Sequence, residues 1–404
     1  MKYARAKGAP YTPIYFLSSL GAGGLVVSFF MYLMFLTPHK GSPIPYFNTI
    51  VPAFQNGSIP MQAMIAVAVI GIIVFAFLHF KTLLWNVSEY RKWKNTDAYS
   101  VFVKGNNESQ LMAMPLAFAM TVNMSFIVGA VLVPGLWEVA QYLFPFAVIA
   151  FLVTAYYALK IFGDFFGRVL TEGGFDCAKN NSFGQMLSVF AFAMIGVGFS
   201  ATTAMSHNIP LVITAFFLSA IFIMAAVVLG AIFLVMGFRA MMEHAAEKET
   251  TPTLWIIIPF ITVVGIAIFR MFKSLDHNFG VEWANGSIFS FLMMLFAIQL
   301  VFGFLGFVVM KRVGYYGHYV SGEAISPGAF TLICPGVSIF VFANFVINPG
   351  LAGLGVVDQL SYVHLALYVP LVLVQIKTVM TYFRLNNKML HNEPSAPASI
   401  VPAE

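Results

Sequence analysis

Ten stretches of apolar residues, each long enough to cross a lipid bilayer, fill this chain almost from end to end. A spanning helix needs about 20 apolar residues in succession. The interior of a bilayer offers no water to backbone groups, so each stretch is expected to be helical. The expected spans are 13–36, 62–85, 111–134, 143–170, 183–205, 209–237, 253–272, 287–310, 327–347 and 361–383.

The composition agrees with a membrane protein and leaves little room for anything else. The 404 residues are 60% hydrophobic and 9% charged, whereas charged residues make up about 25% of a soluble domain. We expect one all-α transmembrane domain over residues 1–385 and a disordered, proline-containing cytoplasmic tail over residues 386–404. A soluble catalytic domain would not fit, and no Walker loop, HExxH or GxSxG motif occurs.

The odd-numbered stretches begin at a nearly regular interval. From the third stretch on, the starts at Leu111, Phe183, Pro252 and Pro327 are 72, 69 and 75 residues apart. That period fits two helices with their loops, so the sequence predicts five helical hairpins around a central pore. The first interval, from Pro13, is longer at 98 residues. A proline-rich loop at 37–60 and a charged segment at 81–108 lengthen it, and the loop is expected to cover the outer mouth or a neighbouring subunit, or to be a plain structured loop.

The distribution of basic residues predicts the orientation. If alternate loops lie on alternate sides, one side receives 18 of the 21 Lys and Arg residues and the other receives Lys40, Arg270 and Lys273. Basic loops stay in the cytoplasm, so both termini are expected there, in the inner (plasma) membrane. The apolar run after Lys2, Arg5 and Lys7 is too long for a signal peptide and is interpreted as the first span. The net charge of +5 then reflects topology and gives no evidence of nucleic-acid binding.

The odd helices differ from the even ones in carrying proline, glycine and hydroxyl residues. Such residues allow helices to bend and approach closely, and they can also line a wet passage. Ordinary helix packing is the alternative explanation. The candidates to line a pore are Ser18, Gly21, Thr121, Asn123, Ser125, Ser200, Thr202, Pro259, Thr262, Cys334, Pro335, Ser338 and Asn344.

Few ionisable groups fall deep inside the expected spans, which favours an uncoupled conductor. Proton-coupled carriers usually place a carboxylate or histidine near the midplane. Of the eight histidines, only His79 and His364 fall within spans, and they belong to opposite leaflets, which argues against a haem held by two histidines. A coupled secondary transporter and a quinone-interacting subunit of a redox complex remain alternatives. No catalytic group, metal site or cofactor is predicted.

The two cysteines give no disulfide framework, because Cys177 falls in a cytoplasmic loop and Cys334 in the ninth span. A thiol beside Pro335 in a pore helix could meet a soft substrate such as a tellurium, selenium or sulfur oxyanion. Cys334 is otherwise interpreted as a small apolar packing residue. Alkylation from the aqueous side distinguishes the two interpretations.

Two short motifs resemble a known family. The seventh span begins Pro252-Thr253-Leu254-Trp255-Ile256 and reaches Pro259, and the ninth contains Pro327-Gly328-Ala329-Phe330 followed by Pro335-Gly336-Val337-Ser338. These are similar to inner helices of the tellurite-resistance/dicarboxylate transporter (TDT) family, which includes the TehA proteins and the plant slow anion channels. A divergent, TsoY-like branch is one placement within it. Ten helices and cytoplasmic termini match that family along the whole chain.

The resemblance implies a homotrimer in the lipid bilayer with one pore per subunit, lined by the five odd helices and surrounded by the even ones. It also implies passage of small anions, occluded by a phenylalanine of the ninth helix. Here the chain departs from the pattern, because Leu332, Ile333, Cys334 and Pro335 stand near the aligned point. Phe330 is the gate candidate, and a non-aromatic plug is the alternative. Tellurite, dicarboxylate, chloride, nitrate and sulfite all fit such a pore.

Overall fold

A computed structural model describes residues 3–5 and 9–391, and their backbone is almost entirely helical. Ten helical segments are long and apolar enough to cross a membrane, which confirms the all-α, ten-helix prediction. The segments are Pro13–Leu36 (η1 and α1), Ile59–Trp93 (α3), Asn106–Leu132 (η2 and α5), Leu136–Glu172 (η3 and α6), Met186–Met205 (α7), Ile209–His244 (α8), Lys248–Phe279 (η4 and α9), Asn285–Arg312 (α10), Pro327–Ala352 (η6, α11 and η7) and Tyr362–Met389 (α12).

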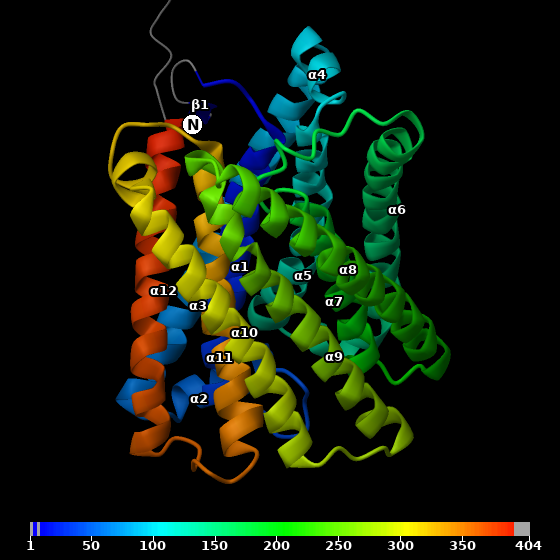
Figure 1. The fold of residues 1–404 in the computed structure, drawn as a ribbon. Coiled ribbons are helices and arrows are strands. Elements are labelled where there is room, and N and C mark those ends of the chain that lie inside the picture. The colour runs from blue at the N-terminus through cyan, green and yellow to red at the C-terminus, as the bar shows by residue number, and fades with distance from the viewer. Residues whose placement is uncertain (1–2, 6–8, 392–404) are drawn as a thin grey trace, which may run out of the picture.

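Three short helices lie outside these segments. Helix α2 (Phe47–Gln55) is in the proline-rich loop, α4 (Asp97–Phe102) follows α3, and η5 (Tyr316–Val320) follows α10. Strand β1 (Ala4–Arg5) pairs antiparallel with β2 (Leu390–His391), so the two ends of the described chain lie together. We call the side of the molecule that carries this strand pair the terminal side (Figure 1).

The helices fall into two sets by burial. In the most apolar part of each segment, 56–94% of the residues are buried in α1, α5, α7, α9 and α11, but only 17–39% in α3, α6, α8, α10 and α12. The buried set makes contacts in a closed order, α1 with α5, α5 with α7, α7 with α9, α9 with α11 and α11 with α1. Each of these helices also contacts the next spanning helix along the chain. We call the buried set the inner helices and the other set the outer helices.

Small residues allow two inner helices to approach closely where the ring closes. A Cβ atom at Gly21 of α1 would lie 2.9 Å from Ile333 Cγ2 of α11, and one at Gly24 would lie 3.2 Å from Val337 Cγ1. Glycine at these two positions therefore permits the packing of the first inner helix on the last. Hydrogen bonds join the outer helix α12 to α1 at the same place. The Gln375 side-chain carbonyl accepts from the Tyr32 hydroxyl, and its amide group donates to the Ser28 hydroxyl.

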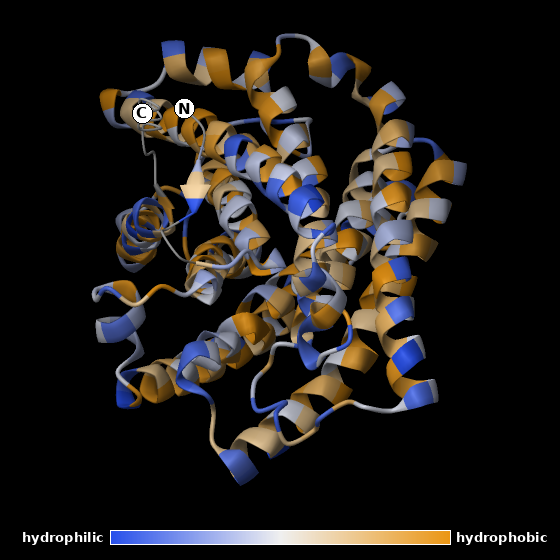
Figure 2. Cartoon of the chain, turned by 90° about the horizontal axis from the view of Figure 1, so that it is seen from above, coloured by the Kyte–Doolittle hydropathy of each residue, from blue (hydrophilic) through white to orange (hydrophobic). Residues whose placement is uncertain are grey.

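Hydrophobic residues, coloured orange in the view from above, recur along the helices of the molecule (Figure 2). Large exposed hydrophobic residues include Phe77, Phe146, Phe217, Phe304 and Leu373, one on each outer helix. Exposed apolar surface of this extent suits lipid and not water.

The structure differs from the sequence-based spans mainly at helix ends. Helix α3 continues beyond the expected residue 85 to Trp93, because its last turns pack on the start of α1. There Asn86 Nδ2 donates to the Tyr15 carbonyl over 3.1 Å and Glu89 lies 3.4 Å from Arg5. Helix α12 likewise continues to Met389, and the rest of the expected tail, from residue 392, lies outside the described residues.

Candidate functional site: two cavities inside the inner helices

The inner helices share an unusual start on the terminal side. Helices α1, α5, α9 and α11 each follow directly on a 3₁₀ segment, namely η1 (Pro13–Tyr15), η2 (Asn106–Met112), η4 (Lys248–Ile256) and η6 (Pro327–Leu332). Helix α7 follows three successive bonds of the same i to i+3 type, from Phe183 to Ser188. All five helices therefore present their N-termini to the same side of the molecule.

Proline residues mark the change from 3₁₀ to α-helix. Pro115, Pro259 and Pro335 each occupy the third residue of an α-helix, in α5, α9 and α11. Proline is tolerated in the first turn of an α-helix, where its missing N–H group would have no partner. The sequence suggested bends in the spans, and in the structure these prolines fix where the regular helix begins.

A cavity of about 350 Å³ lies among these helix starts, and we call it the inner cavity. Its lining is mixed and includes polar residues such as Asn106, Lys179, Gln185 and Glu249, together with Pro259. Two of its buried side-chain oxygens, Gln185 Oε1 and Ser326 Oγ, have no protein hydrogen-bond partner among the described residues. Water or a polar solute would satisfy them.

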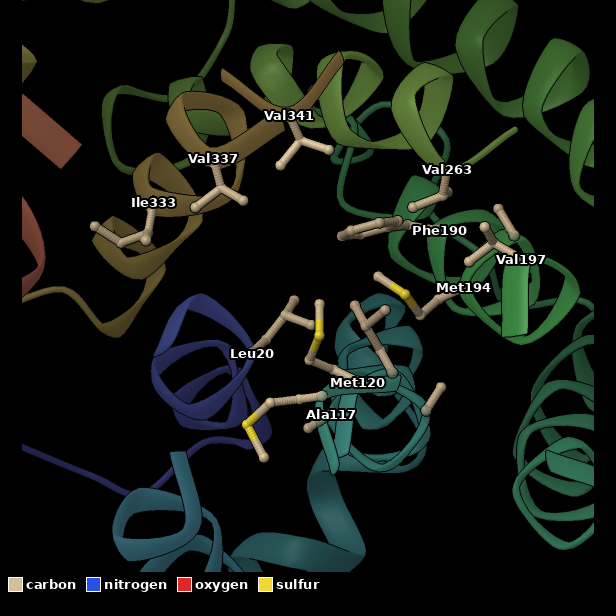
Figure 3. Packing of buried hydrophobic residues seen from close by; sticks show 14 of the residues in the cluster. Leu20, Ala117, Met120, Phe190, Met194, Val197, Val263, Ile333, Val337 and Val341 are labelled. Atoms are coloured by element: carbon tan, nitrogen blue, oxygen red, sulfur yellow. The ribbon is translucent and has the colours of Figure 1, made fainter. Parts of the chain in front are cut away.

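A second cavity, of about 380 Å³, begins in the middle of the inner helices and extends to Ile44 and Trp137 near the side opposite the termini. We call it the outer cavity. Its walls are mostly apolar, with Val263, Val337 and Val341 on one side and Met120 and Met194 on the other (Figure 3). Part of it passes between α5 and α7 to reach Phe144 and Phe151 of α6.

Three residues line both cavities, namely Leu20 of α1, Phe190 of α7 and Cys334 of α11. Figure 3 shows the Leu20 and Phe190 side chains directed into the same central space from facing helices. Leu20 is 1% and Phe190 4% exposed, so little room is left between the two cavities at this level. We call these three residues the constriction.

The structure brings together part of the predicted pore lining. The candidates that line the outer cavity are Asn123, Ser125, Thr202, Thr262, Cys334 and Ser338, and Pro259 lines the inner cavity. Ser18, Gly21, Thr121, Ser200, Pro335 and Asn344 line neither cavity. The hydroxyls of Ser18 and Ser200 donate to the carbonyls of Tyr15 and Val197, which is the packing role that the sequence left as the alternative.

The gate candidate Phe330 also lies away from both cavities. It belongs to η6, is 0% exposed and lines neither space. The aromatic residue at the constriction is Phe190, which sequence reasoning did not single out among 43 phenylalanines. Its only sequence signal was its place in the fifth expected span, 183–205, one of the odd-numbered spans.

One charged residue of the outer cavity was missed as well. By sequence, Arg270 belongs with the basic residues of the outer side, near the end of the expected span 253–272, but the structure places it well inside α9 (Ile257–Phe279), on the wall of the outer cavity. Because α9 continues for seven residues beyond the expected span, Arg270 lies within the helix and not at its end. Neither Asp nor Glu lines the outer cavity in the described part of the chain.

The histidines within the spans have structural partners. His79 Nδ1 lies 2.8 Å from the Ser19 carbonyl and Nε2 lies 2.8 Å from Thr121 Oγ1, so the ring joins α3, α1 and α5. His364 Nε2 lies 2.9 Å from Asn348 Oδ1, which joins α12 to η7 (Val346–Ala352). Within residues 3–5 and 9–391, no three His, Cys, Asp or Glu side chains group as a metal site would require.

Comparison with known proteins adds no assignment. No family model matches the chain, and no curated protein matches it. The functional argument therefore depends on the two cavities, the constriction and the charges around them.

Proposed function

We propose that this protein is a membrane channel or transporter for small anions, most simply an uncoupled conductor, whose path runs through the inner cavity, the constriction and the outer cavity. The observation that carries the proposal is that two cavities at opposite ends of the inner helices share Leu20, Phe190 and Cys334. The contacts of each inner helix with its two ring neighbours and with the following outer helix support five hairpins around this path.

The electrostatics of the outer cavity favour anions, whereas the inner cavity combines helix N-termini with a lining that includes Glu247, Glu249 and Lys179. Five helix N-termini face the inner cavity, and each carries a partial positive charge of about half an elementary charge. In the outer cavity, the basic side chain is the Arg270 guanidinium, and no carboxylate of the described residues lines that cavity. The apolar constriction would restrict passage by excluding water when it is closed.

The membrane orientation follows from the charge distribution. The terminal side carries 18 of the 21 basic residues by the loop assignment, and basic loops stay in the cytoplasm. We place the inner cavity at the cytoplasmic face and the outer cavity at the external face of the plasma membrane. The motifs in η4 and η6 support membership of the TDT family, and a trimer, with one path per subunit, follows from that resemblance.

Flux through purified protein tests the proposal. We expect liposomes containing the full chain to pass chloride, nitrate or small carboxylates down their gradients, without any need for a proton gradient. Flux that strictly requires a proton gradient would show a coupled carrier instead. Absence of flux for every anion of the panel would contradict anion transport altogether.

The native thiol at the constriction gives a second, local test. In a Cys177→Ser background, a small methanethiosulfonate reagent should reach Cys334 and block flux, and a Cys334→Ser variant should resist the block. The Cys177→Ser/Cys334→Ser protein controls for effects of the reagent elsewhere. Full flux after complete modification of Cys334 would place the conduction path away from the constriction.

A further inference from the structure

The Arg270 side chain has an unusual environment for a cation. It lies nine residues before the end of α9 at Phe279, which is about 14 Å along the helix axis at 1.5 Å per residue. Its side chain lines the outer cavity, whose walls are mostly apolar. The Nη1 atom donates to the Val197 carbonyl of α7 over 3.1 Å.

No carboxylate lies within 4.0 Å of the Arg270 guanidinium in the described part of the chain. Other cations of the molecule do have such partners. Arg168 lies 2.7 Å from Glu108, and Lys273, one turn after Arg270, lies 3.3 Å from Asp276. A charge held in an apolar surrounding without a counter-charge is costly, so an anion that enters the cavity would be stabilised there.

The shape of the group narrows the class of anion. A guanidinium has five N–H donors in one plane and pairs best with two oxygens of a planar anion. Because Arg270 uses a single N–H on the Val197 carbonyl, the others remain for a ligand. The hydroxyl residues Ser125, Thr202 and Ser338 line the same cavity and add further donors.

We propose that Arg270 forms a binding subsite in the outer cavity for a small planar oxyanion, a carboxylate or nitrate, which it holds in preference to chloride. The subsite lies between the external mouth of the outer cavity and the constriction. That the subsite lies on a conduction path rests on the proposed function. Anion binding at the subsite does not itself require flux.

Calorimetric titration of the detergent-purified full chain tests the subsite with sodium formate, sodium nitrate and sodium chloride. We expect formate and nitrate to bind more tightly than chloride. Arg270→Lys keeps a cation but loses the planar pair of donors, so it should weaken formate and nitrate binding by about tenfold and change chloride binding little. Arg270→Gln should lose measurable binding of all three anions.

Lys273→Gln is the matched control, because it removes a basic residue from the same helix, where it is paired and about half-exposed. It should bind the three anions as the unaltered protein does. Equal formate binding by the unaltered protein and by Arg270→Gln would overturn the proposal. If Arg270→Gln elutes as aggregate, Arg270→Lys decides, and unchanged formate and nitrate affinities in that variant would overturn it too.

The same variants in liposomes separate this inference from the proposed function. If binding depends on Arg270 but the protein passes no anion, the subsite is supported and the proposed transport function is contradicted. Flux in the unaltered protein, with the same half-saturating formate concentration in Arg270→Gln, would leave transport standing and contradict the subsite.

Discussion

Phe190 and Phe330 are both buried aromatic residues of inner segments, but only Phe190 lies on the walls of the two cavities. Phe330 packs in the 3₁₀ segment before α11, whereas Phe190 lies in the second turn of α7 and points toward Leu20 (Figure 3). The position of the side chain relative to the ring, and not its residue type, decides which aromatic group can obstruct the path.

At this scale we predict that Phe190→Ala raises anion flux several-fold, because the substitution removes the largest side chain of the constriction. The measurement is the initial rate of anion efflux from liposomes at equal protein density. The paired variant is Phe330→Ala. It should lower thermal stability, since emptying a fully buried phenylalanine site costs about 3–5 kcal/mol, without raising flux. If only Phe330→Ala raised the flux, the gate would be Phe330 of η6 and not Phe190.

At the scale of elements, the start of each inner helix is fixed by contacts with its neighbours. Segment η2 begins five residues before the expected span, and its polar residues are held by partners from other elements. Glu108, 6% exposed, accepts from Arg168 of α6 over 2.7 Å. The Asn106 side chain bonds both the carbonyl and the amide of Asp176. Hydropathy alone favours a later start, since these residues are polar.

The Glu108–Arg168 pair predicts a measurable coupling between η2 and α6. Glu108→Gln should destabilise the protein by about 3 kcal/mol, because it leaves a partly buried guanidinium without its counter-charge. The double variant Glu108→Leu/Arg168→Met should recover most of that loss. Denaturant unfolding in detergent, followed by circular dichroism, measures both. Additive losses in a complete double-mutant cycle would show that the pair contributes no interaction energy.

At the scale of the whole molecule, the two ends of the described chain lie together on the side to which the loop assignment gives most basic residues. The exposed Cys177, between α6 and α7, belongs to that side, while Cys334 lies at the constriction. The two native thiols can therefore be used to test the orientation and the conduction path without introducing further cysteines.

We predict that a bulky, membrane-impermeant maleimide labels Cys177 of a Cys334→Ser variant in inside-out vesicles and not in intact cells. Detergent-solubilised protein, in which Cys177 is accessible from both sides, controls for reactivity of the thiol. Labelling in intact cells would reverse the orientation, place the inner cavity outside, and put the Arg270 subsite on the cytoplasmic side.

The sequence by itself determined the number and type of the long apolar elements. A run of about 20 apolar residues can satisfy its backbone in a bilayer only as a helix, so hydropathy was enough to locate all ten helices, including Leu211 to Gly237 in the middle of α8. Periodicity also separated two sets of helices, because small and hydroxylated residues gather where helices pack closely.

Tertiary structure decided which side chains face the cavities. Ser200 and Thr202 are two residues apart on α7, yet the Ser200 hydroxyl bonds to the Val197 carbonyl while Thr202 lines the outer cavity. Arg270 likewise lies on the wall of the outer cavity, within a helix that continues past its apolar stretch to Phe279. The rotation of each helix about its axis and the residue at which it ends depend on contacts with neighbouring helices. Where a helix is apolar on nearly all sides, its own sequence does not indicate which face makes those contacts.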